Sequence, residues 1–143
     1  MTSTSELNEL IEITRDGQRF YQHACEEVKD VELQHLFRDM AQAKTQVIQA
    51  LSVKLAADHK KVSQGGTMVG KLRELYMDTK TKLGGDPRVA YVDQLEEVED
   101  RILHAFEDAL EGAEPDVRAL LATELPRLRA CHSRMQQLKH SLH

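Results

Sequence analysis

The stretch Val-Asp-Gln-Leu-Glu-Glu-Val-Glu-Asp-Arg-Ile-Leu-His-Ala-Phe, residues 92–106, decides the fold class. Its apolar residues Val92, Leu95, Ile102 and Phe106 recur at intervals of three or four, the spacing of one buried face of an α-helix. Glu99 falls on the same stripe, so a carboxylate interrupts the apolar face. The stretch therefore predicts a helix that buries one charged residue.

The same periodicity continues on both sides of this stretch, between breaks at Asp30, Gly65-Gly66, Gly84-Gly85 and Gly112. The connections near positions 29 and 113 are too short for anything but helical hairpins. A short amphipathic segment fills the long crossover between the hairpins. We therefore expect one all-α domain over residues 1–143, an antiparallel four-helix bundle with a short additional helix in its crossover. Its helices should span about 4–28, 31–60, 67–83, 87–111 and 115–142.

Composition narrows the range of partners. The chain has 143 residues and a net charge of -5, and nucleic-acid binding would need a concentrated basic face instead. No apolar run approaches the roughly 20 residues needed to span a bilayer. Cys25 and Cys131 lie far apart, which favours reduced thiols in the cytoplasm over a disulfide framework. We expect no nucleic-acid, membrane or cofactor binding, and an unknown protein partner or self-association as the open alternatives.

Five polar residues fall on the predicted inward faces near the middle of the bundle. Thr14 and Lys44 lie about 15 residues on either side of position 29, so they should face each other. Glu99 and Arg129 lie at similar distances from the turn near 113, with His132 one turn deeper. Because an isolated buried ion is costly, we expect Glu99 to pair with Lys44 or Arg129, and Thr14 and His132 to complete the hydrogen bonds. The alternative is that Lys44 and Arg129 extend outward along the helix surface.

Two other motifs resemble reactive or metal-binding pairs. Glu32 and His35 form a Glu-x-x-His pair, but it lies in the first turn of its helix and no second pair faces it. Cys131 and His132 are adjacent, so on a helix their side chains point about 100° apart. We therefore expect an exposed surface pair, two structural cysteines, no catalytic residue and no metal site.

Several blocks of the chain share a pattern with known sequences. The blocks are Leu7-Asn8-Glu9-Leu10-Ile11, Asp16-Gly17-Gln18-Arg19-Phe20-Tyr21, Leu36-Phe37-Arg38-Asp39-Met40-Ala41, the segment 66–83, and Glu97-Val98-Glu99-Asp100. These blocks resemble a bacterial four-helix-bundle family of unknown function. That family is similar in fold to the ferritin-like superfamily, which includes the rubrerythrins.

The resemblance implies a bundle whose metal centre has been lost. Ferritin-like proteins bind two metals with one Glu from each of two helices and a Glu-x-x-His pair from each of the other two. Only a Glu and a His remain among the six corresponding positions, and two of the others carry positive charge. We therefore expect a non-enzymatic interaction or stress-associated module; the alternatives are an iron-handling or oxidoreductase protein and a small-ligand-binding bundle. The six positions are Thr14, Lys44, Val47, Glu99, Arg129 and His132.

Overall fold

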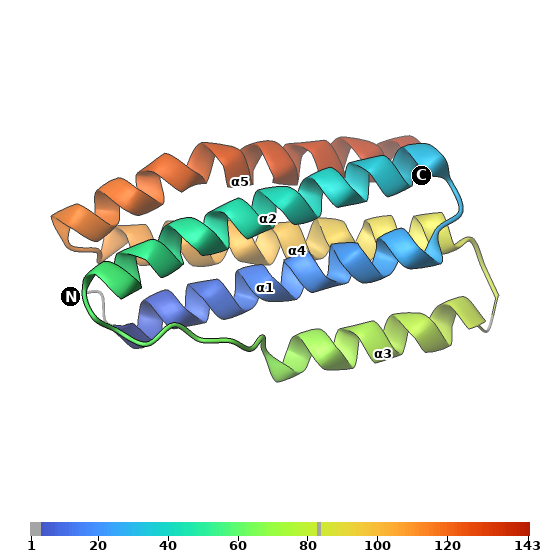
Figure 1. Cartoon of the computed structure of the whole chain (residues 1–143). Coiled ribbons are helices and arrows are strands. Elements are labelled where there is room, and N and C mark those ends of the chain that lie inside the picture. The colour runs from blue at the N-terminus through green and yellow to red at the C-terminus, as the bar shows by residue number, and fades with distance from the viewer. Residues whose placement is uncertain (1–3, 83) are drawn as a thin grey trace.

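Five α-helices form the chain in a computed structural model that describes residues 4–82 and 84–143 (Figure 1). No strand occurs within these two ranges, so the predicted all-α class is confirmed. Within the part of the chain that the structure describes, no helix combines the length and the apolar character that spanning a bilayer requires. In chain order the helices are α1 (Thr4–Glu27), α2 (Val31–Ala57), α3 (Met68–Lys82), α4 (Pro87–Glu111) and α5 (Pro115–Leu142).

The helix ends follow from local chemistry. The Asp30 carboxylate accepts a hydrogen bond from the Leu33 amide at 3.1 Å and caps α2. α2 ends at Ala57 rather than at residue 60, because His59 adopts a left-handed φ of 58°. The Lys60 amide then returns to the Leu55 carbonyl at 2.8 Å, which closes the last turn. The predicted end of the crossover helix at Leu83 lies outside the described residues.

Four long helices pack side by side, and α3 lies outside them along α1 (Figure 1). The chain reverses direction between α1 and α2 and again between α4 and α5, and these two hairpins have the most extensive contacts. α1 also packs against α4, and α2 packs against α5, so the four helices enclose a common interior. α3 contacts α1 and α4 more sparsely.

The apolar interior is divided into two clusters at opposite ends of the bundle. One contains Leu10 of α1, Leu51 of α2 and Phe106 of α4. The other contains Tyr21 of α1 and Phe37 of α2, together with buried residues of α4 and α5. A buried polar residue lies between the two clusters, or at their boundary, on each of three helices: Thr14 on α1, Lys44 on α2 and Glu99 on α4.

The crossover segment between α2 and α3 is held by polar side chains of α1. The Asn8 side chain binds the crossover backbone twice: its NH₂ group donates to the Lys61 carbonyl at 3.0 Å, and its Oδ1 accepts from the Ser63 backbone amide at 2.7 Å. The Asp16 carboxylate accepts from both the backbone amide, at 2.8 Å, and the hydroxyl of Thr67. The Thr67 hydroxyl also accepts from the Gly70 amide at 3.1 Å, so it caps the first turn of α3. These contacts fix where α3 begins and direct it along α1.

Candidate functional site

A buried ion pair between α2 and α4 is the central polar feature of the bundle. The Lys44 Nζ lies 2.5 Å from the Glu99 Oε1, and the two side chains are 0% and 1% exposed. Neither charged group is in contact with bulk water. Because isolated buried charges cost several kcal/mol each, the two ions depend on each other for compensation.

Tyr21 of α1 completes the pair from a third helix. Its hydroxyl donates to the same Glu99 oxygen at 2.8 Å, and the Lys44 ammonium lies 5.5 Å from the centre of the tyrosine ring. Burial raises the pKa of the Tyr21 hydroxyl well above its ordinary value, and the charge of Glu99 and the hydrogen bond raise it further. Tyr21 therefore remains a protonated donor at neutral pH and stabilises the carboxylate.

The pair is incompletely hydrogen-bonded. The second Glu99 oxygen, Oε2, is buried without a hydrogen-bond partner among the described residues. The Lys44 Nζ is within ion-pair distance of Oε1 but makes no hydrogen bond with the described residues, so the attraction between the two groups is Coulombic. A buried pair of this kind is poor evidence for net stabilisation, although removing one member leaves the other uncompensated.

Thr14 lies at the level of the pair without bonding to it. Its hydroxyl donates to the Leu10 carbonyl at 2.7 Å, one turn back on the same helix. The expectation that Thr14 completes the hydrogen bonds of the ion pair is therefore wrong. Gly17, one turn further along α1, provides space instead. A Cβ there would lie 2.8 Å from Ile102 Cδ1 and 3.8 Å from Lys44 Cε.

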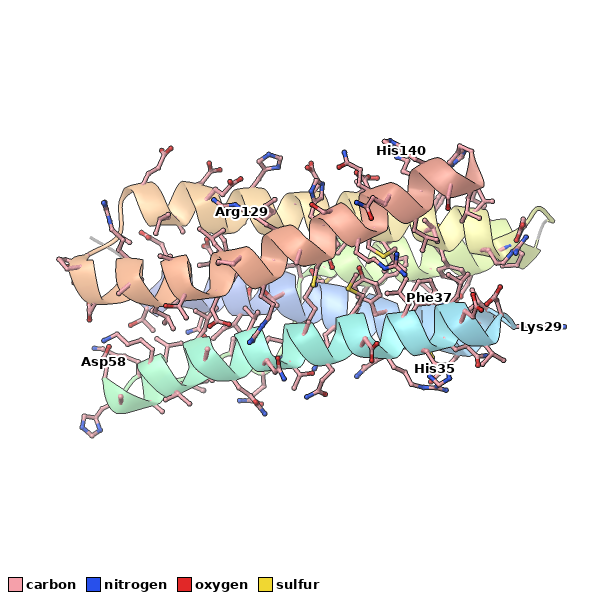
Figure 2. All side chains as sticks on the ribbon, turned by 90° about the horizontal axis from the view of Figure 1, so that it is seen from above. Lys29, His35, Phe37, Asp58, Arg129 and His140 are labelled. Carbon is pink, nitrogen blue, oxygen red and sulfur yellow. The ribbon has the colours of Figure 1, made fainter. Side chains whose placement is uncertain are left out.

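Arg129 and His132 do not belong to the polar layer, contrary to the prediction. Arg129 is 55% exposed and lies 3.5 Å from Glu107, on the side of α5 that faces α4 (Figure 2). His132 is half-buried at the surface of the same two helices, where its Nε2 lies 3.4 Å from Asp100 Oδ1 and 3.8 Å from Glu96 Oε1. Both residues are rotated away from the interior because α5 is phased differently from the expected stripe.

Cys131 occupies the inward position that was assigned to His132. Burial raises the pKa of the Cys131 thiol; the nearby Lys44 ammonium opposes this shift and the Glu99 carboxylate adds to it. A buried thiol with a raised pKa is a poor nucleophile, which agrees with a structural role. Helical spacing alone did not identify Cys131 as the neighbour of the ion pair. The signal was ambiguous, since Leu128, Cys131 and Met135 fit helical spacing as well as Leu128, His132 and Met135 do.

The Glu32–His35 pair lies on the surface. Both residues are exposed, and His35 points away from α5 on the outer side of α2 (Figure 2). This agrees with the expected first-turn surface pair.

A second polar cluster was missed by the sequence analysis. His23 and Glu27 of α1 and Asp78 of α3 each offer one ligand atom, and these atoms lie within 4.8 Å of one another. This geometry allows the three side chains to hold a metal ion, although the sequence analysis expected no metal site. The His-x-x-x-Glu spacing on α1 was a readable signal, because residues four apart share a helix face.

The geometry of the ion pair limits its chemistry. Its only acidic oxygens are taken up or enclosed, its ammonium has no lone pair, and its neighbouring thiol has a raised pKa. Such a layer joins three helices but offers no accessible base, nucleophile or open ligand position. The role of the ion pair is therefore structural: it connects three helices inside the bundle.

The comparisons with known proteins identify the family. A comparison with curated proteins gives no match. A family model described as Domain of unknown function (DUF2383) matches residues 2–112. This range covers α1 to α4 and so includes Tyr21, Lys44 and Glu99. Because the match extends over more than half of the 143 residues, the chain belongs to the DUF2383 family of domains of unknown function.

Proposed function

We propose that this protein is a non-enzymatic helical module with the antiparallel connectivity of ferritin-like bundles, in which an ion pair replaces the metal centre. The observation that carries the proposal is the Lys44 ammonium on the buried Glu99 carboxylate. Two hairpins joined by a long crossover are the connectivity that ferritin-like folds use. The role that follows is binding to other protein chains rather than catalysis.

The ion pair opposes metal binding in two ways. A protonated lysine has three donors and no lone pair, so it cannot serve as a ligand. It also neutralises Glu99, the one carboxylate that the six ligand positions bring into the interior. At the other positions, Thr14 bonds to its own helix, and Arg129 and His132 lie outside the layer.

An iron titration tests the loss of the metal centre. Full-length protein purified without chelator is mixed anaerobically with ferrous iron and then exposed to oxygen. We expect no oxygen consumption above that of a buffer blank. We also expect the native protein and the Glu99→Gln variant to retain the same amount of iron. Stoichiometric iron that is oxidised by the native protein and lost by Glu99→Gln, but retained by the surface control Glu107→Gln, would establish the iron-handling alternative instead.

The outer face of α3 supports the binding role. Met68, Val69, Leu75 and Tyr76 are 76%, 48%, 64% and 58% exposed, on a helix that lies outside the four packed helices (Figure 1). Apolar side chains gathered in this way are typical of protein interaction sites. A helix face of this kind can pair with the same face of a second copy around a two-fold axis. We therefore propose self-association through α3. We also propose a cytoplasmic location, which the two free cysteines support.

Sedimentation velocity tests self-association. We expect the sedimentation coefficient to rise with concentration, and the double variant Met68→Ser/Tyr76→Ser to weaken association at least tenfold. The matched control is Val53→Ser, which removes an equally exposed apolar residue (68%) from α2. A native protein that stays monomeric at every concentration, or a control that weakens association equally, contradicts the proposed surface.

A further inference from the structure

We propose that His23, Glu27 and Asp78 form a binding site for a divalent transition-metal ion, best matched by Zn²⁺, that ties α3 to α1. The site lies outside the Lys44–Glu99 layer and is independent of the function proposed above. Its ligands lie on two different helices, and His23 and Asp78 are 55 positions apart in the sequence.

Two ligands come from one turn of α1 and the third from α3. His23 and Glu27 are four residues apart, so their side chains leave the same face of the helix. Asp78 approaches from α3, and its Oδ1 lies 2.6 Å from the His23 Nε2. With Glu27 included, one ligand atom from each residue lies within 4.8 Å of the other two.

The donor set matches zinc chemistry. One imidazole nitrogen and two carboxylate oxygens are ordinary Zn²⁺ ligands, and the two carboxylates balance the charge of the ion. Imidazole favours zinc over magnesium or calcium, which prefer oxygen ligands alone. With ligand distances of about 2.0–2.1 Å, tetrahedral geometry separates ligand atoms by about 3.4 Å. The Nε2–Oδ1 distance would therefore open by less than about 1 Å, which side-chain rotation can supply. Glu27 is exposed, so a fourth, solvent ligand has access.

Tyr91 supports the imidazole from inside the bundle. Its side chain is fully buried on α4, and its hydroxyl lies 3.3 Å from the His23 Nε2. The two rings also pack edge to face, with their centres 5.9 Å apart. Two groups, the Asp78 carboxylate and the Tyr91 hydroxyl, thus converge on one nitrogen that carries either a proton or a lone pair. A metal ion on that lone pair would replace both contacts to Nε2 and take the Asp78 carboxylate as a second ligand. The edge-to-face packing of the Tyr91 ring would still hold the imidazole in place.

Calorimetric titration of the untagged full-length chain with Zn²⁺ tests the site. We expect one ion per chain, no comparable binding of Mg²⁺, and a rise in melting temperature that grows with free Zn²⁺. His23→Ala and Asp78→Asn should each weaken binding at least tenfold. Glu27→Gln, at an exposed position, should also weaken it.

The matched control is His104→Ala. His104 lies 3.4 Å from Asp100, one turn away on α4, and so forms a surface His–carboxylate pair without the α3 ligand. This variant should bind Zn²⁺ like the native chain. Absence of binding by the native protein overturns the proposal. Equal loss in His104→Ala, equal binding of Mg²⁺, or full retention by Glu27→Gln and Asp78→Asn would overturn it as well.

Discussion

The Lys44→Met variant should lose about 3–5 kcal/mol of unfolding free energy, the cost of leaving a buried charge without its partner. Methionine keeps the length and apolar stem of lysine, so the change removes the ammonium with little change in packing. Glu99 would then be buried with only the Tyr21 hydroxyl as a donor. Urea unfolding followed by circular dichroism at 222 nm measures the loss, and a midpoint that falls at constant slope identifies it as a change in stability.

Arg129→Ala is the matched control for this prediction. Arg129 also pairs with a carboxylate of α4, Glu107, but it is 55% exposed and its partner is 39% exposed. Exposed pairs contribute about 0–1 kcal/mol, so this variant should unfold close to the native midpoint. Equal losses in Lys44→Met and Arg129→Ala would mean that the Lys44 environment is solvated, in conflict with its burial.

Asp16→Ala should release α3 from the bundle while the four long helices stay folded. The Asp16 carboxylate accepts from the amide and the hydroxyl of Thr67, immediately before the first residue of α3. Hydrogen bonds to a charged group contribute about 1.5–3 kcal/mol each, so their loss should speed amide exchange in α3 at least tenfold. Hydrogen exchange read by mass spectrometry, peptide by peptide, compares residues 68–82 with the four long helices.

The control for Asp16→Ala is Asp39→Ala. Asp39 is an exposed aspartate of α2. It should leave exchange in α3 unchanged. Uniformly faster exchange across all helices in Asp16→Ala would instead show that Asp16 supports the whole bundle. Unchanged exchange in α3 would show that the apolar contacts of α3 alone hold it in place.

The sequence predicts the helices well because each depends on local signals. Asp30 and Asp86 are N-caps, Pro87 and Pro115 begin helices, and the described helices start within a residue of the predicted positions. The end of α2 was misplaced by three residues. A helix end is usually predicted from a glycine in the left-handed conformation, but here His59 adopts that conformation.

The polar layer could be predicted only in part, because helical spacing does not fix the rotation of a helix uniquely. On α2 and α4 the apolar stripes around Lys44 and Glu99 leave one inward face, and the structure buries both residues. On α5 two stripes were available, and the interior takes Cys131 in preference to His132. Burying a thiol costs far less than burying an imidazole that can become charged, which gives the physical reason for this choice.

Contacts between distant segments could not be read from periodicity at all. His23 meets Asp78 because α3 lies along α1, where Asp16 also binds the Thr67 backbone just before α3 begins. These hydrogen bonds join residues about 50 positions apart, and no local pattern encodes such pairings.

A double-mutant cycle between Lys44 and Glu99 tests the central claim most directly. The amide that Glu99→Gln introduces can still accept from Tyr21 and carries no charge, so Lys44→Met/Glu99→Gln leaves no buried ion. We expect this double variant to be more stable than the sum of the two single losses by about 2–3 kcal/mol. Single losses that simply add, within about 0.5 kcal/mol, would contradict an ion pair at the centre of the bundle.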